Sequence, residues 1–225
     1  MRRLCLIFCF SFAYYSGEFI QALEKPNIVL ILADDLGYSD LGCYGSEIST
    51  PSLDNLAKNG LRFSQFYNNG KCAPSRASLV TGLYPQQTND GSNVRNVLNM
   101  AQALKSAGYH TLMTGRSGGF SKSPTESGFE RFYGLLNGCC NYFNPGLRRP
   151  GENEPGRKSP GEQRAWEDDG KVMQPFTPGN DFYATDSFTQ RALNYLKEYG
   201  KSDKPFFLYL PYTAPHFPIH ARPED

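Results

Sequence analysis

The chain lacks an excess of charge of either sign. It has 225 residues, with 23 Lys and Arg against 22 Asp and Glu. Without a basic excess it cannot displace the counterions around phosphates in bulk, so a nucleic-acid binder that relies on net charge is excluded. Hydrophobic residues make up 39% of the chain and charged residues 20%, a globular composition that excludes wholesale disorder. The length suits one domain of ordinary size.

The sequence also lacks an apolar run of membrane-spanning length. The uncharged run at 4–15 follows Arg2 and Arg3 and is shorter than the roughly 20 residues that a spanning helix needs. With the small residues that lead to Ala22, this pattern is typical of a secretory signal peptide; the alternative is an uncleaved anchor. We expect 1–22 to be a signal peptide and 23–225 to be exported, periplasmic or extracellular, with no membrane span after cleavage.

Cysteine is too sparse and too awkwardly spaced for a disulfide scaffold. Four cysteines lie beyond the expected signal peptide, namely Cys43, Cys72, Cys139 and Cys140. The last two are adjacent, and Cys72 belongs to a motif that suggests another role. There is no CxxC pair and no zinc-knuckle spacing, so a disulfide framework and a structural zinc site are both disfavoured.

Alternating strand and helix patterns predict an α/β fold. The expected strands are 27–33, 61–67, 109–114 and 205–210, and the expected helices are 51–59, 74–81, 94–107 and 181–199. The runs NIVLILA and PFFLYL are typical of strands buried on both faces. We expect a mostly parallel central sheet with helices on both faces. Ligands of such sheets collect beyond the carboxyl ends of the strands.

The segment 137–180 shows neither a helical nor a strand period. Pro-Gly recurs in it at 145, 150, 155 and 160, separated by polar triplets. One interpretation is a mobile, turn-rich, irregular insertion. The other is a surface loop that walls a substrate pocket.

Two acidic residues, Asp34 and Asp35, follow the first expected strand. Adjacent carboxylates repel each other unless a cation lies between them, and hard divalent cations such as calcium and magnesium take oxygen ligands of this kind. An isolated Asp-Asp pair is more often a solvated loop or a helix cap, so the pair alone is weak support for a metal site.

The motif Cys72-Ala73-Pro74-Ser75-Arg76 precedes an expected helix. A cysteine just ahead of a helix N-terminus lies in a positive field that favours a thiolate or a bound anion. Arg76 would point back to the same place and could hold an oxyanion. A phosphatase loop would need Arg where Ser78 stands. The three histidines, His110, His216 and His220, form no cysteine-protease pattern.

Together these segments resemble the formylglycine-dependent sulfatases of the alkaline-phosphatase-like superfamily. The resemblance is carried by PNIVLILADDLGYSDLGCYG at 26–45, TPSLDNLAKNGLRFSQFY at 50–67, CAPSRASLVTG at 72–82, GFERFYG at 128–134 and YTAPHFP at 212–218. It implies a hydrolase of sulfate esters and an alkaline-phosphatase-like fold. The cysteine motif is long and is the most specific of the five segments.

The resemblance also implies a cofactor and roles for individual residues. A maturation enzyme would convert Cys72 to Cα-formylglycine, whose hydrated aldehyde attacks the sulfur of the ester. Asp34, Asp35 and modified Cys72 match ligands of a bound calcium, with magnesium the less favoured ion. Arg76 matches the arginine that stabilises the diol, and His216 matches a histidine near the sulfate oxygens.

The sequence departs from the family in two places. Where members carry TGKWHxG, this chain has Thr114-Gly115-Arg116-Ser117-Gly118-Gly119, so the Lys and the His are absent. Arg116 could bind a sulfate oxygen but cannot give up a proton at neutral pH. Members also run further than 225 residues, and their later metal ligands would lie beyond this chain. We therefore expect 23–225 to be the N-terminal portion of a sulfatase catalytic domain, truncated at its C-terminus.

Other hypotheses stay open at this point. The chain could be a catalytically impaired fragment or pseudoenzyme that retains sulfate binding, or a phosphate or phosphonate monoester hydrolase of the same fold. His216 could simply bond to backbone. A zinc pair of His216 and His220 is disfavoured because Pro218 prevents the helix that would align them.

Overall fold

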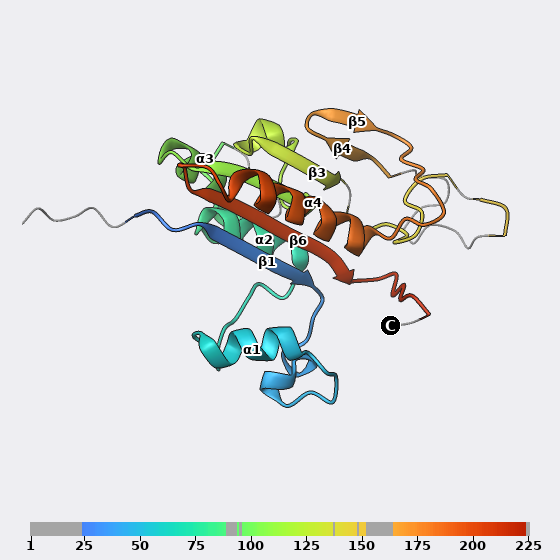
Figure 1. The fold of residues 1–225 in the computed structure, drawn as a ribbon, viewed down its shortest axis with the longest axis horizontal. Helices are drawn as coiled ribbons and strands as arrows, with labels where there is room; N and C mark the ends of the chain where they lie inside the picture. Colours follow the sequence, from blue (N-terminus) through green and yellow to red (C-terminus); the bar gives the residue numbers. More distant parts are fainter. Residues whose placement is uncertain are drawn as a thin grey trace, which may run out of the picture.

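The computed structural model describes residues 24–88, 94, 96–136, 138–147, 149–151 and 164–223. Its centre is a six-stranded sheet in the order β1-β6-β2-β3-β4-β5 (Figure 1). The strands are β1 (Ile28–Asp34), β2 (His110–Arg116), β3 (Arg131–Leu135), β4 (Trp166–Asp168), β5 (Lys171–Met173) and β6 (Phe206–Pro215). The first four in spatial order are parallel, and β4 and β5 add an antiparallel edge. The expected mostly parallel sheet is confirmed.

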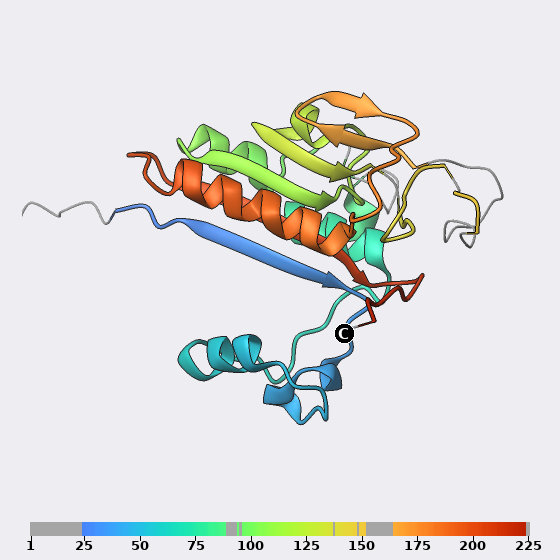
Figure 2. The same cartoon turned by 45° about the vertical axis from the view of Figure 1, so that its right-hand side comes forward.

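Helices cover both faces of this sheet. The four α-helices are α1 (Pro51–Asn59), α2 (Cys72–Thr81), α3 (Met100–Ser106) and α4 (Ala184–Tyr199). Successive side chains of a strand point to opposite faces. On β6, Phe206 and Leu208 pack in the cluster under α4, whereas Phe207 and Tyr209 pack in the cluster that includes residues of α2 and α3. The helix α1 stands apart from the sheet (Figure 2) and packs against the short 3-10 helix Gly42–Tyr44.

The helix predicted at 94–107 begins later than the apolar stripe suggests. Helix α3 starts at Met100, because the side chain of Asn99 accepts a hydrogen bond from the backbone N–H of Gln102 and caps the first turn. Val94 instead forms a parallel bridge with Phe120. The predicted start at 94 was therefore wrong, because the cap at Asn99 starts the helix within the apolar stripe and not at its beginning. Helix α4 likewise starts at Ala184 rather than 181.

The strand predicted at 61–67 is absent from the described structure. Residues 61–67 carry an alternating pattern but pair with no strand, and Leu61 and Phe66 are largely exposed. Alternation alone does not make a strand without a neighbour to bond to. Conversely, β6 continues past the predicted end at 210, because Pro215 pairs with Asp34 of β1.

The segment 137–180 is not wholly irregular. It contains the hairpin of β4 and β5, whose three-residue strands are too short to show a period. Trp166 of β4 is fully buried and stacks on Phe176 and Phe188. The expected signal peptide at 1–22 and residues 152–163 lie outside the described residues. Of the helices in the described ranges, none combines the length and apolar character that a bilayer crossing requires.

Candidate active site

Four of the six site residues singled out in the sequence line one hollow, and Arg116 and His216 lie beside it. A cavity of about 200 Å³ beyond the end of β1 is lined in part by Asp34, Asp35, Cys72 and Arg76. The residues come from two segments, the end of β1 and the start of α2. The parallel topology places both at the edge of the sheet where ligands of α/β proteins collect.

Asp34 is a buried carboxylate held by two arginines. Its Oδ2 lies 3.2 Å from Nη2 of Arg76 and also accepts a hydrogen bond from Nη1 of Arg116. All three residues are at most 4% exposed. Burying a charge is costly unless it is paired, and here two cations face one anion. The buried group therefore carries a surplus positive charge that favours an incoming anion.

Several donors of these arginines have no protein acceptor. Among the described residues, Nε and Nη1 of Arg76 and Nε of Arg116 are buried without a hydrogen-bond partner. Arg76 otherwise makes a long contact of 3.4 Å to the carbonyl of Tyr212. A buried, unsatisfied donor costs about 1–3 kcal/mol, so an anion that accepts from these groups would recover that energy.

Next to Arg116, Gly115 allows the strands β2 and β6 to approach closely. Gly115 has φ +136, and a Cβ placed there would lie 2.1 Å from the carbonyl oxygen of Pro211 in β6. Only glycine fits this contact. Arg116 then lies with Nη2 3.4 Å from Sγ of Cys72. Burial lowers the pKa of Arg116, but a guanidinium stays charged at neutral pH.

Cys72 is the first residue of α2, not the residue before it as the sequence suggested. Lys71 has extended backbone and forms the N-cap, and its carbonyl accepts from Ser75 N–H at 3.1 Å. The thiol is partly buried. The N–H groups of a helix's first turn carry partial positive charge, so position 72 suits a group that becomes negative.

His216 directly follows β6 and faces Asp35. Its Nδ1 donates to the carbonyl of Phe217 at 2.5 Å, and its Nε2 lies 3.7 Å from Oδ2 of Asp35. The backbone contact fixes the tautomer, so Nε2 is the nitrogen free to exchange a proton. Asp35 has φ +65, an uncommon conformation for a residue other than glycine. One nitrogen of His216 thus bonds to backbone and the other lies near Asp35, which lines the hollow, and a role of His216 beside a sulfate stays a prediction.

The sequence pattern did not point to two tyrosines that lie near the site. Tyr209 of β6 is almost fully buried; burial raises its pKa, and the nearby Arg76 and Arg116 oppose that rise. Its only sequence signal is membership of an apolar strand. Tyr142 donates its hydroxyl to the carbonyls of Thr213 and His216. It lies in the segment without periodicity, so no pattern could have singled it out.

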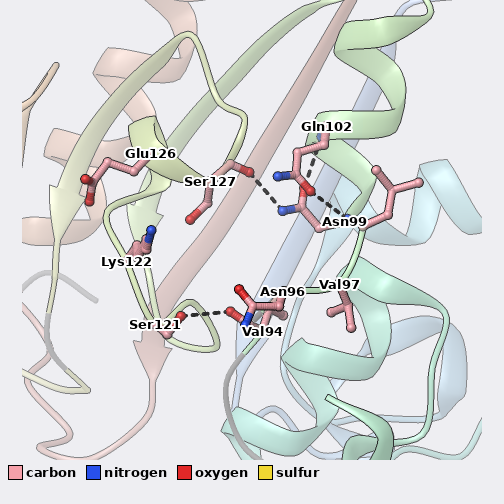
Figure 3. A pocket seen from close by; sticks show the side chains of 10 residues that line it. Val94, Asn96, Val97, Asn99, Gln102, Ser121, Lys122, Glu126 and Ser127 are labelled. Atoms are coloured by element: carbon pink, nitrogen blue, oxygen red, sulfur yellow. Dashed lines mark hydrogen bonds between the residues drawn. The ribbon is translucent and has the colours of Figure 1, made fainter. Parts of the chain in front are cut away.

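A larger hollow, of about 730 Å³, is lined by other residues (Figure 3). It lies between the N-terminal end of α3 and the 3-10 helix Pro124–Ser127, and none of the predicted site residues lines it. Its polar groups largely bond to one another: Asn99 donates to the carbonyl of Ser127, and Ser121 donates to the carbonyl of Val94. The strand-end cavity is therefore the candidate active site.

The donor set fits a divalent cation only in part. Asp34 and Asp35 offer hard oxygen ligands, but Oδ2 of Asp34 is already engaged by two arginines. In the part of the chain that the structure describes, no three His, Cys, Asp or Glu side chains converge on one point. Calcium takes six to eight oxygens, so these two carboxylates can form only a portion of a calcium site.

Comparison with known proteins gives a consistent pattern. A family model described as Sulfatase matches residues 26–225. An arylsulfatase of Klebsiella aerogenes is 30% identical over 243 aligned residues, covering 100% of this chain and 50% of the relative. Mouse arylsulfatase J is 35% identical, covering 88% of this chain and 34% of its own length. The chain thus spans half or less of the curated relatives' lengths.

Solved structures agree. A crystal structure of Ps i-CgsB in complex with k-i-k-neocarrahexaose has a TM-score of 0.73 and 36% identity, covering 89% of this chain and 48% of the other. A phosphonate monoester hydrolase of Agrobacterium radiobacter has a TM-score of 0.54 and 21% identity, covering 85% and 41%, which shows a shared fold alone.

Proposed function

The chain belongs to the sulfatase family and has its alkaline-phosphatase-like fold, and from this we propose that the protein hydrolyses sulfuric esters at the hollow formed by Asp34, Cys72 and Arg76. The observation that carries the proposal is the surplus of buried positive charge beside the first residue of a helix. That arrangement suits a sulfate group held next to a nucleophile at position 72.

In this proposal the nucleophile is made from Cys72 by a maturation enzyme. The resulting Cα-formylglycine supplies a hydrated aldehyde oxygen that attacks the ester. The residues of this chain prepare its surroundings: the first turn of α2 favours negative charge at position 72, and Arg116, now 3.4 Å from the sulfur, would bind oxygens that stand there.

Sulfate binding falls to the two buried arginines. The unpartnered Nε and Nη1 of Arg76 and Nε of Arg116 are donors that a sulfate oxygen could engage. Because both guanidiniums are already fixed by Asp34, they need little reorganisation when the anion arrives.

Proton transfer falls to His216. Arg116 stands where the family usually has Lys, and it cannot give up a proton at neutral pH. Nε2 of His216, held by the Nδ1 contact to Phe217, can take or deliver one. A single side chain, that of His216, would thus carry out the proton transfer.

A calcium ion, rather than magnesium, would be held by Asp34 and Asp35 with the modified residue 72. It would act as a Lewis acid towards the sulfate. The two acids provide fewer oxygens than calcium requires, so no step of the proposed reaction is routed through the ion.

A sulfated saccharide is the substrate class that we propose. The support is the similarity to Ps i-CgsB, whose structure contains a neocarrahexaose. The phosphonate hydrolase shares only the fold, so a sulfate ester is better supported than a phosphate or phosphonate ester. The signal peptide that we propose at residues 1–22 would direct the protein to a periplasm or out of the cell, where such saccharides occur.

The test is to co-express the chain with a formylglycine-generating enzyme and analyse the tryptic peptide Cys72–Arg76 by mass spectrometry. We expect conversion of Cys72, turnover of a sulfated galactose oligosaccharide or an aryl sulfate, and little turnover of the matched aryl phosphate. Cys72→Ala is the control without a nucleophile. An unmodified thiol under these conditions would count against the proposal.

One result would favour the second candidate, an impaired sulfate-binding protein. Its motivation is the absence of the family's Lys and His around Arg116. It predicts full conversion of Cys72 and measurable sulfate binding by calorimetry, with no turnover of any ester.

A further inference from the structure

A tyrosine hydroxyl holds the loop that carries His216 by hydrogen bonds to its backbone. The hydroxyl oxygen of Tyr142 lies 2.7 Å from the carbonyl oxygen of Thr213 and 2.6 Å from that of His216. Tyr142 is 2% exposed, and its contact to Thr213 is buried, whereas its contact to His216 is partly buried. A phenol has one proton, which it shares between the two acceptors.

This contact completes the fixation of His216. The backbone N–H of His216 donates to the carbonyl of Thr213 at 3.0 Å and closes a turn. Its own carbonyl accepts from Tyr142, and Nδ1 of its ring donates to the carbonyl of Phe217. The peptide and one ring nitrogen are thus held, and Nε2 is left facing Asp35 at 3.7 Å.

Tyr142 is itself anchored at both of its backbone groups. Its N–H donates to Nδ1 of His220 at 3.3 Å, and its carbonyl accepts from the N–H of Ala184, the first residue of α4, at 2.8 Å. The side chain of Asn141 accepts from the N–H of Phe143 at 2.9 Å and so fixes the turn that holds Tyr142. Tyr142 therefore connects the start of α4, through its carbonyl, to the histidine loop, through its hydroxyl.

We propose that Tyr142 is a positioning residue, which fixes the peptide of His216 so that its ring faces Asp35 and the hollow. The catalytic consequence rests on the proposed function, whereas the positioning itself does not. Burial raises the pKa of Tyr142, so its hydroxyl keeps its proton and remains a donor throughout the neutral range.

The variant Tyr142→Phe removes the hydroxyl and keeps the ring. The matched control is Tyr133→Phe, which removes a tyrosine hydroxyl bonded at 2.8 Å to Ser187, away from the histidine loop. The chain has only three histidines, so NMR spectra of histidine-labelled protein can be assigned with His216→Gln and His220→Gln. We expect the His216 ring signals to shift or broaden in Tyr142→Phe and the His110 signals to stay in place. In Tyr133→Phe the His216 signals should not change.

Kinetics of the converted protein give the second readout. We expect kcat of Tyr142→Phe to fall about tenfold, the effect of about 1.4 kcal/mol, with KM changed less than twofold. In the double variant with His216→Ala, the Tyr142 substitution should cause no further loss, because the two residues act as one unit. A general structural role would instead lower the activity of His216→Ala again.

Each outcome decides the proposal. Unchanged His216 signals together with unchanged kcat would overturn it. If the converted wild type shows no turnover but the His216 signals respond, the proposed function fails and the positioning role stands. If Tyr142→Phe does not fold, Asn141→Ala keeps the hydroxyl and releases its turn; it should move the same His216 signals, and their failure to move would overturn the proposal.

Discussion

Arg116 at the end of β2 donates a hydrogen bond to Asp34 at the end of β1, across the strand β6 that lies between them. The two residues are 82 positions apart in the chain. The contact joins the buried charges of β1, β2 and α2 in one group beside Cys72. The first two predictions test this group of buried charges and the close approach of the strands beside it.

Arg116→Ala should lower both stability and sulfate affinity. It leaves the buried carboxylate of Asp34 with Arg76 alone, and breaking a buried ion pair typically costs 3–5 kcal/mol; the remaining arginine should limit the loss to about 2–3 kcal/mol. Urea unfolding measures the free energy of unfolding. The control is Arg222→Ala, which breaks an exposed pair with Asp186 and should cost less than about 1 kcal/mol. Equal costs would contradict the buried network.

Gly115→Ala should destabilise the protein far more than substitution of a glycine in open space. The new Cβ would meet the carbonyl of Pro211, and the backbone would have to move, which we expect to cost more than about 3 kcal/mol. Gly170 also has positive φ but has nothing within 4 Å of a new Cβ, so Gly170→Ala should cost only about 1 kcal/mol for the backbone conformation. Thermal unfolding of the two variants gives the comparison.

His220 should make stability depend on pH below neutrality. Burial lowers its pKa in the folded state, so the unfolded chain takes up a proton first as the pH falls. The stabilisation is complete above the unfolded pKa of about 6.5 and is lost progressively below it. Free energies of unfolding at several pH values, compared with His220→Asn, measure the effect. A wild type and a variant with parallel pH profiles would refute it.

Asn99→Ala should shorten or loosen the start of α3. The side chain caps the helix through Gln102 N–H and also donates to the carbonyl of Ser127, so its loss should cost about 1–2 kcal/mol. The control is Asn59→Ala at the C-terminal end of α1, which removes contacts only to the exposed Asn55. Hydrogen exchange at the amides of α3 localises the change.

The sequence predicted best where a strand is a continuous apolar run. The strands β1 and β6 were found for this reason, but burial on both faces was right only for β6, because β1 is an edge strand whose Val29 and Ile31 are exposed. The parallel pairing of the two strands brings Asp34 and His216 to the same edge of the sheet. The roles of these residues stay predictions. What the pattern could not give were contacts set by tertiary structure: the side of the helix on which Cys72 lies, the β4–β5 hairpin around Trp166, and the pairing of Arg116 with Asp34.

Local chemistry also overrode periodicity. Asn99 caps α3 within the apolar stripe that predicted an earlier start of the helix. Residues 61–67 alternate between apolar and polar side chains but have no neighbouring strand to pair with. Tyr142 is the clearest omission, since its importance lies in two carbonyls more than 70 residues further along the chain. No spacing in a single sequence encodes such a contact.

The three fixed charges beneath the hollow bear on which ester is accepted. Asp34 contributes one negative charge, and Arg76 and Arg116 contribute two positive ones. A sulfate monoester is a monoanion, whose charge equals the surplus of these three buried residues. A phosphate monoester, whose second pKa is about 6, arrives at neutral pH mostly as a dianion and brings one negative charge more than this surplus. Under the proposed function, the preference for a sulfate ester over a phosphate ester should therefore depend on pH, and lowering the pH towards 5 should narrow it.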